Sequence, residues 1–193
     1  MTVYVLAMAN ADKAREIRQI LGPGIELADR PAEVPDVEET GDTLADNARL
    51  KAVALVEATG MAAIADDTGL EVDALGGAPG VRSARYAGEG ASYGDNVAKL
   101  IEALRDVEGD GRRAARFATV AIALWPDGTE RTGRGTVEGW IAESPRGGGG
   151  FGYDPVFVPA EGDGRTFAEM ETDAKHRLSH RGRALRALLD ELP

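Results

Sequence analysis

The residues of this sequence best suited to chemistry are charged side chains near the ends of predicted elements. The first group is the junction Ala9-Asn10-Ala11-Asp12-Lys13, where a strand pattern gives way to a helix pattern. A helix N-terminus offers unpaired backbone N–H groups and a partial positive charge, and the Lys13 ammonium can reach the same anion. This junction therefore predicts a phosphate site. An ordinary helix start, with Asp12 as the N-cap, is the alternative.

The second group consists of carboxylates. Asp66 and Asp67 follow a short apolar run at 61–65, and open α/β sheets commonly bind ligands beyond the ends of such strands. Because adjacent strand residues point to opposite faces, we expect one carboxylate to face a pocket and the other to hold the loop. Glu38 and Glu39 in an acidic loop are further oxygen donors, and carboxylates without histidine or thiolate suit Mg²⁺. A hydrogen-bonded turn is the alternative interpretation.

Two later segments could recognise the rest of a ligand. In the glycine-rich segment 146–155, the aromatic rings of Phe151 and Tyr153 lie beside backbone N–H donors, a combination that predicts a binding site for a nucleotide base. Packing of both rings in the core is the alternative interpretation. Further on, Ser179 is a plausible N-cap that places His180 and Arg181 in a first helical turn. Together with Lys175 they predict an anion or carbonyl-oxygen site, with a solvated basic helix start as the alternative.

The composition limits the functions that these residues can have. The 193-residue chain has a net charge of −11, which repels phosphate backbones, so we do not expect a nucleic-acid-binding protein. It has no cysteine, which excludes thiolate metal sites and is consistent with a cytoplasmic location. Its N-terminal segment has neither a basic region nor a long apolar run, so we expect no signal peptide and no membrane span. Only four of the basic residues are lysines, which makes each one notable.

Helices and strands must alternate to position these side chains. Apolar periodicity and Gly/Pro punctuation predict strands at 2–9, 25–27 and 61–65, a hairpin from 117–125 and 132–141, and helices at 12–21, 43–58, 95–105 and from 179 onward. The segment 76–90 is too rich in glycine and proline for regular structure. We therefore expect an α/β protein, with a mixed β-sheet flanked by helices, as a single domain over residues 1–193.

Taken in order, these segments resemble the inosine triphosphate pyrophosphatase family. The similarity extends over almost the whole chain, and three of the four lysines fall at positions that contact substrate in the family. The matching stretches are Asn10-x-x-Lys13, Glu38-Glu39-Thr40-Gly41, Asn47-Ala48-x-x-Lys51-Ala52, Ala65-Asp66-Asp67-Thr68-Gly69-Leu70, Leu75-Gly76-Gly77-Ala78-Pro79-Gly80, Ser83-Ala84-Arg85-Tyr86, Gly149-Gly150-Phe151-Gly152-Tyr153-Asp154-Pro155 and Lys175 with Ser179-His180-Arg181.

The resemblance implies a function, a fold and a set of site residues. The function is Mg²⁺-dependent hydrolysis of inosine, deoxyinosine and xanthosine triphosphates to the monophosphate and pyrophosphate, and the fold is an elongated mixed sheet in a homodimer. Asp67 is implied as metal ligand and proton acceptor, with Glu39 or Glu38 as a further ligand. The implied substrate contacts are Met8, Ala9, Asn10, Ala11, Asp12, Lys13, Lys51, Thr68, Arg85, Phe151, Gly152, Tyr153, Asp154, Lys175, His180 and Arg181.

One departure from the family pattern keeps alternatives open. Met8 and Ala9 stand where the family has a hydroxyl residue followed by glycine, so a hydroxyl and a flexible residue are missing from the expected phosphate loop. A nucleotide-binding protein with impaired catalysis is therefore one alternative. A related pyrophosphatase for other modified nucleotides is another.

Overall fold

The computed structural model describes residues 2–8, 10–108 and 112–193. The chain forms two compact units, each assembled from separate stretches of sequence. The first contains Met1–Asp67, Thr119–Gly135 and Arg181–Pro193, and the second contains Thr68–Ala118 and Thr136–His180. Each unit has its own hydrophobic core and is described by itself below.

The strands form a mixed sheet, as predicted. Among the described residues the sheet has seven strands in the order β2-β1-β3-β5-β6-β7, with β4 paired to β3. Their bounds are β1 Val3–Leu6, β2 Glu26–Ala28, β3 Ala62–Val72, β4 Pro79–Gly80, β5 Ala114–Leu124, β6 Glu130–Ile141 and β7 Phe157–Pro159. β1 pairs parallel to both β2 and β3. β4 pairs antiparallel to β3, and β7 pairs antiparallel to β6.

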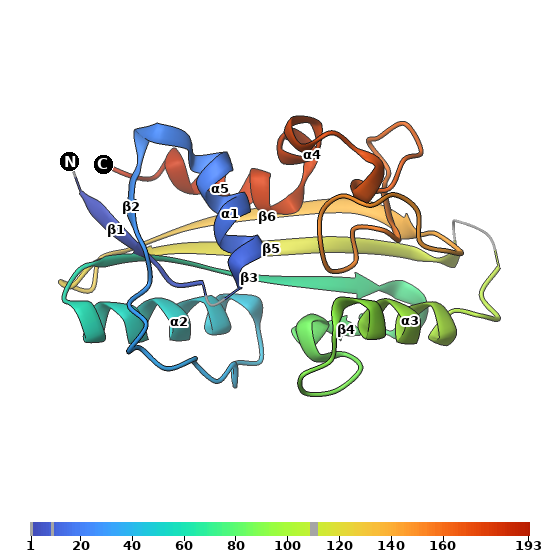
Figure 1. The fold of residues 1–193 in the computed structure, drawn as a ribbon, viewed down its shortest axis with the longest axis horizontal. Helices are drawn as coiled ribbons and strands as arrows, with labels where there is room; N and C mark the ends of the chain where they lie inside the picture. Colours follow the sequence, from blue (N-terminus) through green and yellow to red (C-terminus); the bar gives the residue numbers. More distant parts are fainter. Residues whose placement is uncertain (1, 9, 109–111) are drawn as a thin grey trace. The chain divides into compact units, whose positions relative to one another are not determined.

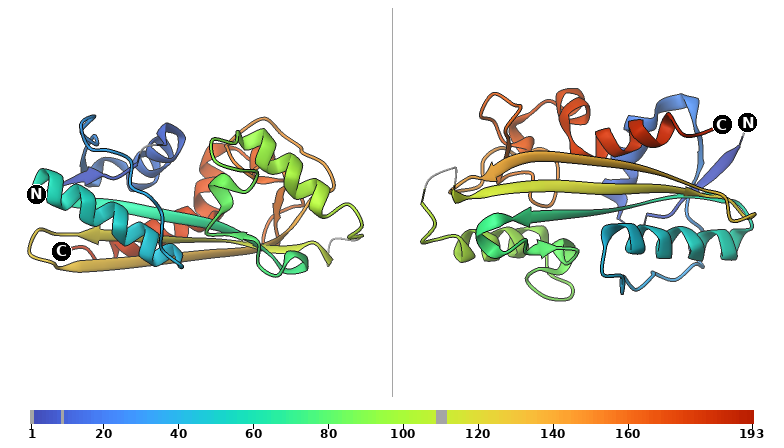
Figure 2. Two further views of the ribbon diagram at one scale, coloured as in Figure 1. Left: turned by 90° about the horizontal axis from the view of Figure 1, so that it is seen from below. Right: turned by 180° about the vertical axis from the view of Figure 1, so that it is seen from behind.

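Helices cover both faces of the sheet. Their bounds are α1 Ala11–Leu21, α2 Leu44–Thr59, α3 Tyr93–Ala103, α4 Thr172–Leu178 and α5 His180–Leu189, with short 3₁₀ turns at Gly22–Gly24, Asp73–Leu75, Ser83–Arg85 and Phe167–Glu169. In the first unit α1 and α5 lie on one face and α2 on the other (Figures 1 and 2). In the second unit α3 and α4 lie on opposite faces in the same way. None of the described helices combines the length and apolar character that crossing a bilayer requires.

Capping and apolar periodicity explain where the helices of the first unit begin and end. Thr43 caps α2 by accepting a hydrogen bond from the Asp46 amide, and Gly60 ends the helix in the left-handed conformation. The buried residues Ala48, Ala52 and Leu55 of α2 and, on the other face of the sheet, Ile17 of α1 all belong to the core of this unit. The buried face of α5 joins the same core, so both faces of the sheet are closed by apolar side chains.

The second unit has an aromatic core. The rings of Phe117 and Phe157 lie 4.8 Å apart edge to face, and Phe167 packs against both. Helix α3 lies on the face of the sheet opposite α4 (Figure 1). It begins after a capping box between Ser92 and Asp95, two residues before the predicted start. These aromatic side chains share the core of the second unit with aliphatic residues, including Leu70, Leu100 and Val137.

Three predictions about local structure were wrong. The strand predicted at 61–65 continues as β3 to Val72, because the two aspartates are neutralised by cationic partners and so tolerate burial in a strand. The seven-residue helix α4 was not predicted, since its polar sequence is too short to show a clear apolar period. The segment 76–90, predicted to lack regular structure, contains β4 at Pro79–Gly80 and the 3₁₀ turn at Ser83–Arg85. Separately, the N-cap of α1 is Asn10, so the alternative interpretation with Asp12 as the N-cap is wrong.

Candidate functional site

The N-terminus of α1 places a lysine beside a capped helix start. The Asn10 side-chain oxygen accepts hydrogen bonds from the backbone amides of Asp12 and Lys13, at 2.9 and 3.1 Å. Among the residues that the structure describes, the half-buried Lys13 ammonium has no ion pair within 4.0 Å. Burial lowers its pKa, partly offset by the nearby charge of Asp66. Lys13 is therefore a cation available for an anionic ligand.

A second lysine joins two carboxylates from distant parts of the chain. The Lys51 ammonium on α2 donates to Asp67 Oδ1 at 2.8 Å and to Glu39 Oε1 at 3.1 Å. Only 11% of the Lys51 side chain and 4% of the Asp67 side chain are exposed. Burial opposes the charge on Lys51, but the carboxylates of Asp67, Asp66 and Glu39 together raise its pKa. The acidic loop, α2 and β3 thus meet at one ammonium group.

Asn47, one turn before Lys51 on α2, fixes the acidic loop to the same carboxylate. Its side-chain oxygen accepts from the Gly41 amide at 2.8 Å, and its side-chain nitrogen donates to Asp67 Oδ2 at 3.4 Å. Asn47 is fully buried. A Cβ at Gly41 would lie 2.6 Å from Asp46 Cβ and 2.8 Å from the Asn47 oxygen, so only glycine permits this approach of loop to helix.

Asp66 belongs to a separate buried ion-pair network. Its Oδ2 accepts from Arg181 Nε at 2.9 Å, and Arg181 Nη1 donates to Glu16 of α1. All three side chains are almost completely buried. This network ties β3, α1 and α5 together, and it engages the guanidinium that the sequence predicted as a nucleotide contact.

The two neighbouring aspartates have pKa values shifted in opposite directions. Burial raises the pKa of Asp67, and the cations Lys51 and Lys13 offset only part of that effect. Burial also disfavours ionised Asp66, but Arg181, Lys13 and Lys51 reverse the balance and lower its pKa well below the usual range. Asp66 is therefore a permanent anion, whereas Asp67 is the more basic carboxylate of the pair.

The donor set around Lys51 fits a hard divalent cation. In the described parts of the chain, no three acidic or histidine side chains gather into a ready-made metal cage. Mg²⁺ commonly uses only one or two carboxylates and completes its shell with water and substrate phosphates. Glu39 and Asp67 already converge on one cationic group, which satisfies that requirement. Glu38 is exposed and does not share this ion pair.

In the second unit, Asp154 organises the glycine-rich loop. Its Oδ2 accepts from the Phe151 amide at 2.8 Å and from the Lys175 ammonium at 2.7 Å. That ammonium lies 5.2 Å from the centre of the Phe151 ring. Gly150 has φ +68°, and a Cβ there would lie 2.1 Å from Asp154 Oδ2, so this turn requires glycine.

Tyr153 and His180 are buried in the same unit. The Tyr153 hydroxyl donates to the Ser83 carbonyl at 2.9 Å, and burial raises its pKa. Its side chain belongs to the hydrophobic core, the structural alternative that the sequence left open. The His180 ring stacks on Phe117, with the ring centres 4.4 Å apart. Ser179 directly precedes α5 in an extended conformation, the predicted N-cap position.

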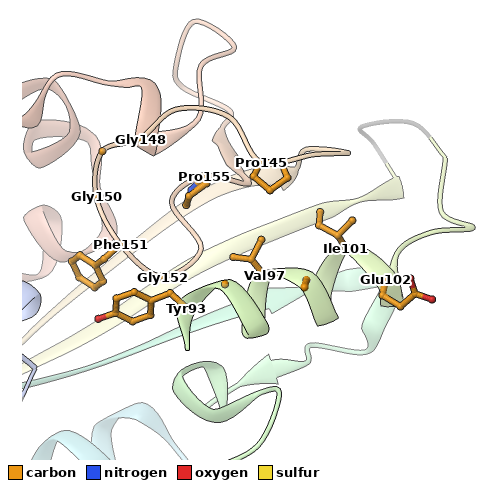
Figure 3. A pocket seen from close by; sticks show the side chains of 13 residues that line it. Tyr93, Val97, Ile101, Glu102, Pro145, Gly148, Gly150, Phe151, Gly152 and Pro155 are labelled. Atoms are coloured by element: carbon orange, nitrogen blue, oxygen red, sulfur yellow. The ribbon is translucent and has the colours of Figure 1, made fainter. Parts of the chain in front are cut away.

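A cavity of about 660 Å³ lies between α3 and the glycine-rich loop of the second unit (Figure 3). Val97 and Ile101 line it from α3, and Pro145 and Pro155 line it from the loop. The lining is mostly apolar, with Glu102 as its one charged residue among those that the structure describes. Such a lining suits an uncharged group better than a phosphate.

The remaining predicted site residues are placed as follows. Met8 is buried in the core of the first unit, and Ala9 lies outside the described residues. Ala11 is the exposed first residue of α1, and Asp12 accepts a hydrogen bond from Arg15. In the second unit Thr68 continues β3, Gly152 has φ +61°, and the partly exposed Arg85 faces Glu89 at 3.7 Å.

Sequence reasoning missed three residues that shape these sites. Glu16 looked like one more polar residue of an amphipathic helix, although its spacing of three from Lys13 places both on one side of α1. Asn47 stood within a matching stretch without an assigned role. Tyr93, whose ring centre lies 5.8 Å from that of Phe151, gave no signal in the sequence.

Together, the mixed sheet with helices on its faces, the capped start of α1 and the buried cluster of Lys51 with Glu39 and Asp67 place the chain in the α/β class. The Ham1 family model matches residues 4–191, and the chain belongs to that family. It is 47% identical over 194 residues to a dITP/XTP pyrophosphatase of Streptomyces coelicolor, covering 98% of this chain and 96% of the relative. It is 50% identical over 190 residues to a dITP/XTP pyrophosphatase of Thermus thermophilus, covering 96% and 89%.

A solved structure agrees with this assignment. The HAM1 protein of Coxiella burnetii superposes with a TM-score of 0.86 at 40% identity, covering 100% of both chains. The family resemblance seen in the sequence and the predicted fold class, a mixed central sheet flanked by helices, are therefore confirmed.

Proposed function

We propose that this protein hydrolyses the triphosphates of deaminated purine nucleosides, with hypoxanthine or xanthine as the base, to the monophosphate and pyrophosphate. The observation that carries the proposal is the cluster in which Lys51 joins Glu39 and Asp67 near the available ammonium of Lys13. Relatives named dITP/XTP pyrophosphatase, at 47–50% identity over nearly the whole chain, support the same activity.

The first unit supplies the groups that a triphosphate needs. Phosphoryl-type displacement depends mainly on positioning and charge neutralisation. Lys13 and Lys51 neutralise phosphate oxygens, and the first turn of α1 adds the positive end of its dipole. These local cations matter because the net charge of −11 disfavours binding of any polyanion elsewhere on the molecule.

Glu39 and Asp67 are the residues proposed to hold Mg²⁺. When bound, the ion supplies Lewis-acid charge neutralisation and lowers the pKa of water. Asp67 orients the attacking water and accepts its proton, a role favoured by burial, which raises the pKa of this carboxyl group. In the metal-free protein, hydrogen bonds from Asn47 and Lys51 hold the Asp67 carboxylate in a single orientation.

The residues proposed to recognise the base lie in the second unit. Hypoxanthine and xanthine present a carbonyl oxygen where adenine presents an amino group, so a buried donor that pairs with the oxygen is left unpaired by ATP. His180 and the backbone amides of the glycine-rich loop are the proposed donors, with Phe151 as an aromatic contact. Lys175 and Asp154 hold that loop in shape. Arg181 acts through its ion pair with Asp66.

A substrate panel with separate detection of pyrophosphate and orthophosphate tests the activity. We expect ITP, dITP and XTP to release pyrophosphate far faster than ATP in the presence of Mg²⁺, and chelation to stop the reaction. Orthophosphate as the first product, or equal turnover of ATP, would contradict the proposal. Faster turnover of modified pyrimidine triphosphates would instead favour the alternative of a related pyrophosphatase.

The position of Met8 is the observation behind the second candidate function. Its side chain is buried in the core and offers no hydroxyl to a phosphate. If the chain binds ITP tightly without turnover, it is a nucleotide-binding protein with impaired catalysis. The double variant Met8→Thr with Ala9→Gly should then restore pyrophosphate release.

Two further properties complete the proposal. The family resemblance supports a homodimer, which sedimentation analysis tests directly. A cytoplasmic location is consistent with a sequence that has no cysteine, and cell fractionation with a specific antibody tests it.

A further inference from the structure

Lys51 occupies the point at which the two proposed metal ligands meet. Its ammonium lies 2.8 Å from Asp67 Oδ1 and 3.1 Å from Glu39 Oε1, and the three side chains are 11%, 4% and 22% exposed, respectively. The two carboxylates come from β3 and from the acidic loop, and Lys51 is the cation that both of them contact. The inference drawn from this geometry rests on the proposed function of the same site.

Two part-buried carboxylates this close together repel each other unless a cation lies between them. In the described structure the Lys51 ammonium supplies that charge. A divalent cation held by the same oxygens requires much shorter contacts, about 2.0–2.1 Å for Mg²⁺. Because an ammonium at hydrogen-bond distance from both carboxylates fills the space between them, the two cations compete for one position.

We propose that Lys51 is an internal counter-ion, which holds Glu39 and Asp67 together in the metal-free protein and leaves them when a divalent cation binds. The displaced ammonium then becomes available to the anionic oxygens of the nucleotide. Lys51 therefore keeps the two ligands preorganised but weakens binding of the metal alone. Lys13 differs because its ammonium has no ion pair within 4.0 Å among the described residues.

Titration with Mn²⁺ alone, without nucleotide, measures this competition through the electron paramagnetic resonance signal of the free ion. Mn²⁺ is the probe because, like Mg²⁺, it prefers oxygen ligands in octahedral geometry. We expect Lys51→Met and Lys51→Gln to bind Mn²⁺ about tenfold more tightly than the wild type, although both variants lose pyrophosphatase activity. Two lysine variants serve as controls.

Lys13→Met removes a nearby positive charge without opening the space between the carboxylates, so it should tighten Mn²⁺ binding by a smaller factor. Lys99→Met removes a charge in the second unit, where its ammonium bonds the Tyr86 carbonyl, and should leave affinity unchanged. Lys51 variants that bind Mn²⁺ no more tightly than Lys13→Met would overturn the proposal.

Thermal unfolding provides a second, independent measurement. Without its counter-ion the carboxylate pair destabilises the metal-free fold, so Lys51→Gln should unfold at a lower temperature in chelator and gain more from added Mn²⁺ than the wild type. An equal gain in both proteins would contradict the counter-ion role. The wild-type substrate panel separates this inference from the proposed function, because pyrophosphate release by the wild type does not depend on the outcome of the Mn²⁺ titrations.

Discussion

Asp66 and Asp67 are neighbours in β3, yet their carboxylates serve opposite faces of the sheet. Asp66 accepts from Arg181 of α5, and Asp67 accepts from Lys51 of α2. The alternation of side chains along a strand therefore places one carboxylate in the ion-pair network of α1 and α5 and the other beside α2. The two carboxylates lie on opposite faces as expected, and the expectation that one of them faces a pocket while the other holds the loop stays a prediction.

Asp67→Asn should abolish most activity without destabilising the fold. Loss of the proposed base and metal ligand is expected to lower kcat for ITP by about 10²–10⁴-fold. Because the pKa of Asp67 is raised in the folded state, its contribution to stability is present at acidic pH and is lost as the pH rises through that value. At neutral pH the ionised Asp67 carboxylate therefore lowers the stability of the folded state. Thermal unfolding of Asp67→Asn should give a melting temperature equal to or above that of the wild type. A clear drop in melting temperature would contradict this account.

Asp66→Asn should behave in the opposite way. Removing one member of a buried ion-pair network costs about 3–5 kcal/mol, because the remaining charges stay buried without it. Since the pKa of Asp66 is lowered in the folded state, its contribution is complete above the ordinary aspartate pKa of about 4 and fades as the pH falls below it. Urea unfolding between pH 7 and pH 3 should show the wild type losing more stability than the variant. The same dependence of the free energy of unfolding on pH in both proteins would contradict the role of Asp66 as a buried structural anion.

Asn47→Ala should lower both the stability of the fold and the apparent affinity of the enzyme for Mg²⁺. The variant leaves the Gly41 amide and Asp67 without their shared partner, at a cost of about 1–3 kcal/mol. The matched control is Asn96→Ala, since Asn96 is also buried and bridges the Ala87 amide and the Ala84 carbonyl in the second unit. We expect comparable losses of stability, but only Asn47→Ala should raise the Mg²⁺ concentration needed for half-maximal activity. The same metal requirement in both variants would argue against a positioning role.

Asp154→Asn should impair nucleotide recognition through the glycine-rich loop. The carboxylate oxygen that binds both the Phe151 amide and Lys175 loses its charge, so we expect KM for ITP to rise and discrimination against ATP to fall by about tenfold. Tyr153→Phe is the control, because it removes a buried hydroxyl that bonds the Ser83 carbonyl. That control should lose about 1 kcal/mol of stability while keeping its substrate preference. Steady-state kinetics with ITP and ATP distinguish the two variants.

Local sequence patterns predicted most of the helices and a candidate site. Residue types at a helix start and a strand end indicated Lys13 as a phosphate contact and the pair Asp66 and Asp67 as candidate metal ligands, because helix ends and carboxylates have local physical signatures. The choice of Asp67 and the inclusion of Lys51 came from the family resemblance. Helix bounds followed from apolar period and capping, and were correct to within two residues for α1, α2 and α3. The ordered match of short stretches indicated the family, which the family model confirms.

Which partner each charged side chain contacts depends on the tertiary fold. Arg181 pairs with Asp66 across 115 positions, and Lys51 selects Glu39 while the neighbouring Glu38 stays exposed. No local pattern reports such pairings, because they depend on where the faces of the sheet place groups from distant segments. The continuation of β3 through both aspartates has the same origin. A strand can bury adjacent carboxylates only when the fold brings a cation to each face.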